Sequence, residues 1–293
     1  MRTPLALLST LVLGITQSVV PLAGQGAGPL HLDVYTADSN AFGVTSTLIS
    51  GRTEAILVDA QFRISDARKL VDRVGATGRR LKAIIVTHPH PDHYFGLGTL
   101  LDRFPGTPVY ISAAGARDFA EHAKAKIAQW TPIYGAEVPR AVPTPQPLPS
   151  ERFTVDGQAV EVIADLQGDE LVRSNSVLWV PSLRAPIAGD VVFLETHVWL
   201  AESNTQTRQA WLASLRRLSA LRPEIVVPGH KRSADLPNDP ASLRFTAQYI
   251  EDFEAAQAVA TNADSLMAAV HRKYPNLGLP IILTLAAKAA FPN

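Results

Sequence analysis

A strand that ends in a cluster of histidines constrains this chain more than any other feature. Residues 82–87 are mostly apolar and largely β-branched, which predicts a buried strand, and His88-Pro-His-Pro-Asp-His93 follows at once. The two prolines keep the residues before them extended, so His88 and His90 can point the same way. Three histidines and a carboxylate within six residues are hard to explain as packing. They are typical ligands of zinc and similar divalent metals.

Strands and helices alternate on both sides of this cluster. Strands are expected at residues 31–35, 44–50, 54–59, 82–87, 109–112, 153–155, 159–164, 176–180, 186–188 and 224–227, and helices at 64–74, 96–104, 113–130, 207–221 and 241–271. Both halves of the chain run strands first and then alternate strand and helix. This order predicts an α/β fold, an αββα sandwich of two mixed β-sheets packed face to face with helices on the outside.

A proline-rich segment separates the two halves. Residues 132–149 contain six prolines, which argue against regular helix or central strand. Two interpretations stay open: a linker between domains, or a stiff surface loop that bridges two halves of one domain.

The composition excludes several classes of function. The 27 basic and 27 acidic residues balance, and no basic stripe is present, so nucleic acid is not an expected partner. The chain has no cysteine, which excludes disulfides, thiolate metal sites and a cysteine nucleophile.

The N-terminal 26 residues are predicted to be a signal peptide. Arg2 is the only charge before His31, an apolar block covers residues 5–13, and small residues at 22–28 offer cleavage sites. The block is too short and too interrupted for a membrane span, so no stable membrane insertion is expected. A buried N-terminal helix or an uncleaved anchor is the alternative. We expect a periplasmic or secreted protein whose mature domain covers residues 27–293.

The motifs together resemble those of the metallo-β-lactamase superfamily. His-x-His-x-Asp-His is similar to the superfamily's ligand signature, and Val58-Asp59 resembles its early strand-end aspartate. Ala188-Gly-Asp190 resembles the Gly-Asp whose carboxylate bridges two metals, and Pro228-Gly-His230 resembles the late Gly-His of the second metal site. The resemblance covers roughly residues 30–260 and implies a zinc centre, with two ions per chain expected and one as the alternative.

The resemblance also implies a role for each side chain. The first metal would take His88 and His90, the second Asp92, His93 and His230, and Asp190 would lie between them. Asp92 would in addition act in catalysis, by orienting the attacking hydroxide and delivering a proton to the leaving group.

One position departs from the superfamily pattern. The superfamily supplies a third histidine to the first metal from a Gly-His-Thr or Gly-His-Ser loop, but the corresponding stretch here is Leu166-Gln-Gly-Asp-Glu170. Asp169 therefore stands where that histidine is expected. Either Asp169 ligates as a carboxylate, or the first site is weak and one metal does the work. The non-functional alternative is a turn residue after Gly168.

His197 is a further candidate, because it follows Asp190 closely in the chain. It is predicted to contact substrate, and less favourably to replace a missing ligand. The alternative is a partly buried histidine paired with a backbone carbonyl.

These residues predict metal-assisted hydrolysis of a small-molecule substrate. The expected activity is that of an exported zinc hydrolase in which a metal-activated hydroxide attacks a cyclic amide or ester, such as a β-lactam or lactone. The first alternative is a thioester or phosphodiester hydrolase on the same dinuclear site. The second is a non-catalytic binding protein whose first metal site has decayed at Asp169.

Overall fold

The computed structural model describes residues 28–292. The predicted signal peptide lies outside the described residues, so export and the boundary at residue 27 stay predictions. Among the described helices, none combines the length and apolar character needed to cross a bilayer.

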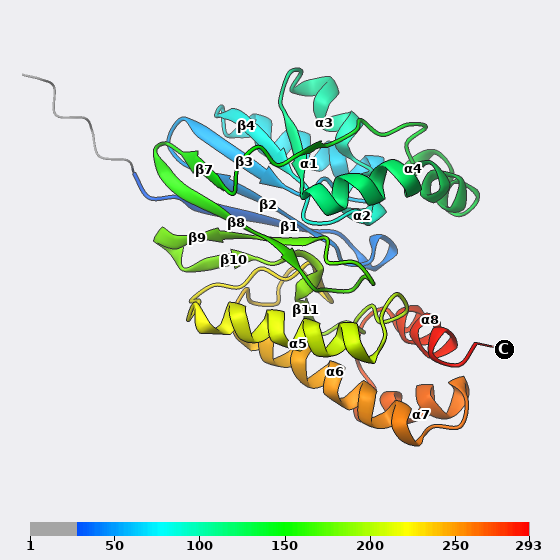
Figure 1. The fold of residues 1–293 in the computed structure, drawn as a ribbon. Helices are drawn as coiled ribbons and strands as arrows, with labels where there is room; N and C mark the ends of the chain where they lie inside the picture. Colours follow the sequence, from blue (N-terminus) through cyan, green and yellow to red (C-terminus); the bar gives the residue numbers. More distant parts are fainter. Residues whose placement is uncertain (1–27, 293) are drawn as a thin grey trace, which may run out of the picture.

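The first half of the chain forms a six-stranded mixed sheet (Figure 1). Its strands, in spatial order, are β1 (His31–Thr36), β2 (Thr45–Ser50), β3 (Glu54–Val58), β4 (Arg80–Ile85), β5 (Val109–Ile111) and β6 (Gln146–Pro147). The pairings β1–β2 and β2–β3 are antiparallel, and those from β3 to β6 are parallel.

The second half forms a four-stranded sheet in the order β10-β9-β8-β7. Its strands are β7 (Arg152–Val155), β8 (Gln158–Leu166), β9 (Asn175–Val180) and β10 (Ala185–Ile187). All three pairings are antiparallel. A short parallel pair, β11 (Phe193–Leu194) with β12 (His230–Lys231), lies beside it.

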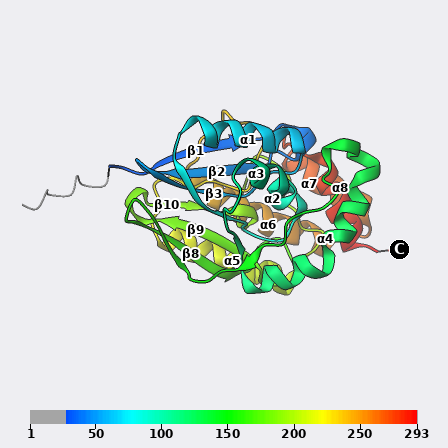
Figure 2. The ribbon, with the colours of Figure 1, turned by 90° about the horizontal axis from the view of Figure 1, so that it is seen from above.

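Helices cover the two outer faces of the sheets (Figures 1 and 2). On the first sheet lie α1 (Ile64–Ala76), α2 (Pro91–Tyr94), α3 (Leu97–Arg103) and α4 (Ala113–Tyr134). On the second lie α5 (Thr205–Ala220), α6 (Ala241–Val259), α7 (Ala263–Lys273) and α8 (Pro280–Ala290).

Alternating side chains of the strands build the layers. In β3, Ala55 and Leu57 pack with residues of α1 and α4, whereas Ile56 and Val58 pack with strands of the second sheet. Burial of Ile56, Leu57 and Val58 stabilises the fold by about 1.5–3 kcal/mol for each side chain. A slip of one residue would exchange the two sets, so the pattern fixes the register. The αββα sandwich is therefore confirmed.

Three local predictions need correction. Helix α4 continues through Pro132 to Tyr134, because the proline falls near the end of the helix and disturbs only its last turn. Residues 224–227 form no strand and contribute one bridge, between Ile187 and Val227. The helix expected over 241–271 is two helices, because Asn262 caps the start of α7. Helix α8 was not predicted.

The proline-rich segment bridges the two halves of the sandwich. Within it, β6 pairs with β5 at the edge of the first sheet, where proline is tolerated. The chain then enters β7 of the second sheet, which shares a core with the first.

Candidate metal centre

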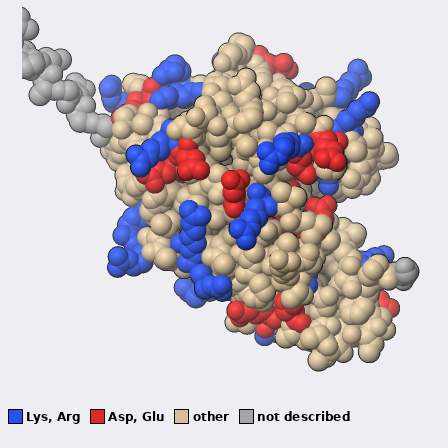
Figure 3. All heavy atoms as spheres, viewed as in Figure 1, with Lys and Arg blue, Asp and Glu red and all other residues tan. Residues whose placement is uncertain are grey.

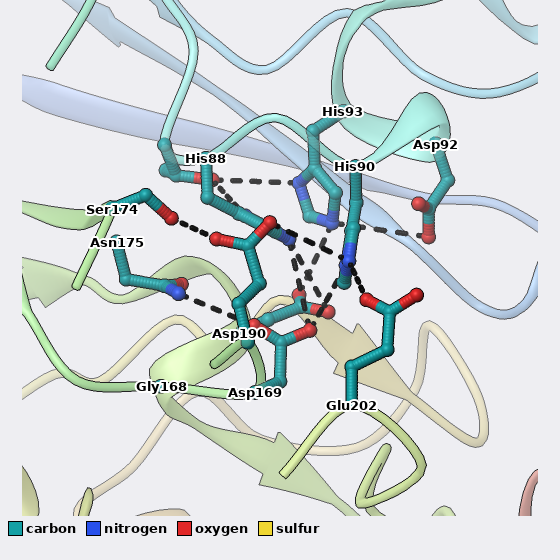
Figure 4. Close-up of polar contacts among 12 residues, drawn as sticks. His88, His90, Asp92, His93, Gly168, Asp169, Ser174, Asn175, Asp190 and Glu202 are labelled. Atoms are coloured by element: carbon teal, nitrogen blue, oxygen red, sulfur yellow. Dashed lines mark hydrogen bonds and ion pairs between the residues drawn. The ribbon is translucent and has the colours of Figure 1, made fainter. Parts of the chain in front are cut away.

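The seven predicted ligands meet where the strands of both sheets end. Figure 4 labels all of them except His230. His88 and His90 follow β4, Asp92 and His93 lie in α2, Asp169 follows β8, Asp190 lies in the turn Gly189–Val191, and His230 begins β12. They form two groups, each with ligand atoms within 4.8 Å of one another.

The first group contains His88, His90, Asp169 and Asp190. Oδ2 of Asp169 lies 3.0 Å from Nδ1 of His90 and 3.8 Å from Nε2 of His88. The Asp169 side chain is fully buried. The carboxylate at the unusual position thus points at both first-site histidines.

The second group contains Asp92, His93 and His230. Oδ2 of Asp92 lies 3.3 Å from Nε2 of His230 and 3.8 Å from Nε2 of His93. The Nε2 atoms of both imidazoles therefore face one carboxylate oxygen of Asp92.

Asp190 belongs to the first group and also contacts the second. Its Oδ1 is 3.1 Å from Nε2 of His93, and its Oδ2 is 3.1 Å from Nε2 of His230. The same Oδ2 lies 3.7 Å from Nε2 of His88 in the first group. This contact with imidazoles of both groups is what a bridging carboxylate requires.

Each of the four histidines has an inner ring nitrogen, which faces the other ligands, and an outer ring nitrogen on the opposite side of the ring. The outer nitrogen lies within hydrogen-bond distance of an acceptor in every case. The outer pairs are Nδ1 of His88 with Oγ1 of Thr87 (3.1 Å), Nδ1 of His93 with Oδ2 of Asp59 (2.8 Å), Nδ1 of His230 with the carbonyl of Phe42 (2.8 Å), and Nε2 of His90 with Oε2 of Glu202 (2.9 Å). A proton on the outer nitrogen leaves the lone pair of the inner nitrogen free for a metal.

Four inner atoms are buried without a hydrogen-bond partner within residues 28–292. They are Nε2 of His88, Nε2 of His93, Oδ2 of Asp169 and Oδ1 of Asp190. A buried polar atom without a partner costs about 1–3 kcal/mol, so four around one space are not explained by packing. Divalent metal ions would satisfy all four, and the donor set fits them.

Two glycines allow the backbone to approach the centre. A Cβ at Gly229 would lie 2.2 Å from Oδ1 of Asp190. Gly189 has φ +49°, and a Cβ there would lie 2.7 Å from the side chain of Thr87. The Gly-Asp and Gly-His motifs therefore each need their glycine for space or for backbone conformation.

Electrostatics differ among the four histidines. Burial opposes the charge of His90, His93 and His230, but the neighbouring carboxylates raise the pKa of each. Burial and the neighbouring His93 lower the pKa of His88, which keeps that ring neutral. Burial alone would raise the pKa of Asp190, but His230 and His93 hold it well below its usual range. Burial raises the pKa of Asp169 to about 6.

Several supporting residues were not found from the sequence. Nδ2 of Asn175 donates to Oδ1 of Asp169 at 3.2 Å, and the Ser174 hydroxyl donates to Glu170. Burial raises the pKa of Glu170 to about 8. Burial opposes the charge of Glu202, but His90 and a lysine lower its pKa to about 2. Glu170 adjoins Asp169 in the chain, which is a weak signal, whereas no motif marks Glu202.

His197 lies in neither ligand group. It is buried in the helical layer beneath the second sheet, and its Nδ1 is 2.8 Å from the Tyr249 hydroxyl. Burial lowers its pKa to about 4. The structure thus does not bring His197 to the ligands, and it pairs with a hydroxyl rather than with a backbone carbonyl.

A cavity of about 360 Å³ adjoins the outer side of His90. Its lining includes Glu170 and Glu202 beside the centre, Lys126 of α4, and the exposed apolar side chains Leu171 and Val172. On the molecular face drawn in Figure 3, basic and acidic side chains are interspersed.

Comparisons with known proteins point to metallo-β-lactamases. The metallo-β-lactamase superfamily model matches residues 39–230. A metallo-β-lactamase family protein from Thermus thermophilus aligns with TM-score 0.61 and 22% identity, over 89% of this chain and 91% of that one. A metallo-β-lactamase from Pontibacter korlensis aligns with TM-score 0.56 and 20% identity, over 76% of this chain and 94% of that one. The DIM-1 metallo-β-lactamase aligns with TM-score 0.56 and 22% identity, over 77% of this chain and 98% of that one. A search of curated proteins gives no match.

Proposed function

The chain belongs to the metallo-β-lactamase superfamily, and from that premise we propose that it is a zinc-dependent hydrolase with two ions per chain. The proposed substrate is a small cyclic amide or ester, such as a β-lactam or a lactone. The observation that carries the proposal is the set of four buried, unpaired ligand atoms that face one another.

In this proposal Asp169 is a true ligand of the first metal, together with His88 and His90. Its buried Oδ2 lies close to a ligand nitrogen of each histidine and has no hydrogen-bond partner among the described residues. Zinc accepts a carboxylate in a histidine-rich set, so the replacement of histidine changes the donor without removing it.

The remaining ligands divide as the distances suggest. Asp92, His93 and His230 hold the second ion, and Asp190 lies between the two. When bound, the metal pair would lower the pKa of water toward neutrality and polarise the scissile carbonyl.

Asp92 is proposed to orient the attacking water and to return its proton to the leaving group. Its side chain is 14% exposed, against 0% for Asp169 and 3% for Asp190. Among the three carboxylates of the centre it therefore lies nearest to an incoming substrate. His197 has no role in this mechanism, since it lies in neither ligand group.

The test is turnover of chromogenic lactam, lactone, thioester and phosphodiester substrates by the purified zinc-loaded protein. Turnover of a lactam or lactone that is lost on chelation and restored by zinc would support the proposal. Rapid phosphodiester or thioester turnover without cyclic acyl activity would replace it with the corresponding hydrolase. At most one tightly bound metal and no metal-dependent turnover would indicate a binding protein.

We also propose that the protein is exported, on the composition of its first 26 residues. Intact-mass measurement of the full chain expressed in a bacterial host would test this. A periplasmic product that lacks about 26 residues is expected, and an uncleaved cytoplasmic product would contradict the proposal.

A further inference from the structure

We propose that Glu202 is a positioning residue for the first metal site, and that the surface ion pair between Glu202 and Lys126 sets the metal affinity of that site. The inference rests on the proposed dinuclear centre and goes beyond it. Glu202 does not ligate the metal. It acts through His90, whose outer nitrogen it holds.

The contact with His90 is direct and selective. Nε2 of His90 lies 2.9 Å from Oε2 of Glu202 and 3.5 Å from Oε1 of Glu170. The other oxygen of Glu170 already accepts the hydroxyl of Ser174. Glu202 is therefore the acceptor of the His90 proton (Figure 4).

This support differs from that of the other three histidines. Their acceptors are the hydroxyl of Thr87, the carboxylate of Asp59 and a backbone carbonyl, and the first two side chains are almost fully buried. The Glu202 side chain is 40% exposed and belongs to the loop before α5, 112 residues away from His90. The first site thus depends on a surface loop for the orientation of one ligand.

The consequence follows from the two tautomers of His90. With its proton on Nε2, held by Glu202, Nδ1 presents a lone pair to the first metal. Without that acceptor, the proton can move to Nδ1, which lies 3.0 Å from Oδ2 of Asp169. A hydrogen bond between these two atoms would occupy two first-site ligand atoms at once. By holding the proton on Nε2 of His90, Glu202 therefore disfavours the hydrogen bond between His90 and Asp169 that would block metal binding.

Lys126 holds Glu202 in place. Its Nζ lies 3.5 Å from Oε1 of Glu202, the oxygen that does not face His90, and its side chain is 25% exposed. Lys126 lies on α4, so the chain of contacts runs from that helix through Glu202 to the first site. Because the pair is near the surface, salt should screen it.

The experiment is a titration of the metal-free full chain with Co²⁺, followed by its visible absorption bands. Glu202→Ala is expected to weaken the first-site Co²⁺ about 10–100-fold, the usual effect of losing an outer partner of a ligand histidine. The second site should change less than about twofold, and Glu202→Gln, which keeps a neutral acceptor, should restore part of the affinity. Lys126→Met should show a smaller loss in the same site.

Glu195→Gln is the matched control. Glu195 lies in the same loop, is 38% exposed and pairs with Arg232. It should leave both affinities unchanged. Unchanged binding of both ions by Glu202→Ala would overturn the inference, and so would an equal loss at both sites or in the control. If the parent chain binds no Co²⁺, the proposed centre itself is wrong, which is a distinguishable result.

Discussion

The two ligand groups of the centre are assembled from different kinds of structure. The second group draws Asp92 and His93 from one short helix, and its imidazoles are fixed by the buried Asp59 and a backbone carbonyl. The first group takes Asp169 from the loop after β8 and orients His90 through a surface carboxylate. We infer that the second site is the rigid one and that the first is where affinity can vary, since loops tolerate change more than helices and strands do.

The largest effect is expected from His230→Ala. This change removes a nitrogen that faces both Asp92 and Asp190, so the second metal should be lost and kcat/KM should fall by about 10²–10³-fold, as for other losses of a main transition-state contact. Elemental mass spectrometry and turnover would measure both. Circular dichroism should show the fold retained, and an active variant with two metals would mean that the second site is assigned wrongly.

Changes at Asp169 separate the first site from the second. Asp169→Ala should lower the metal content from two ions to one and reduce activity about 10–100-fold, while the second ion stays. Asp169→His should retain the first zinc, because it restores a nitrogen donor at the same place. Equal metal content in the parent chain and in Asp169→Ala would show that Asp169 is no ligand.

Metal removal should abolish metal-dependent turnover but only moderately lower the free energy of unfolding. An ion that binds only the folded chain stabilises it by about 2.7 kcal/mol at a free concentration one hundred times its Kd. Chelation should therefore lower Tm by several degrees, and stepwise return of zinc should restore it in two phases. A single phase in which both ions bind together would contradict the contrast between a rigid and a variable site.

The same contrast explains what the sequence could predict. His88, His90, Asp92 and His93 are close enough in the chain for spacing alone to bring them to one centre. In the structure the first two join one ligand group and the last two join the adjacent group. Asp190 and His230 were placed by resemblance, because their contacts join residues 40 apart on different elements. Glu202 could not be found, since it is 112 residues from His90 and no motif surrounds it. The αββα layers were predicted from the order of strands and helices in the two halves, whereas the two-helix split at Asn262 depends on a local cap.

The smallest effect concerns His197, which tests whether the centre ends at the two ligand groups. Its pKa is about 4 in the folded protein, because the ring is buried against Tyr249, and near 6.5 in the unfolded chain. Between these values the unfolded chain binds more protons, so stability should fall as pH drops from 6.5 to 4, by at most about 1.4 kcal/mol per pH unit.

His197→Gln should remove this component of the pH dependence, because glutamine can still pair with the Tyr249 hydroxyl but does not titrate. Urea unfolding of the variant and the parent chain at several pH values would show the difference. Metal content should stay at the parental value and turnover within about twofold, since His197 lies in neither ligand group. Loss of a metal ion, or a large loss of turnover at constant stability, would show that His197 takes part in the active site. The first site would then include a residue of the helical layer.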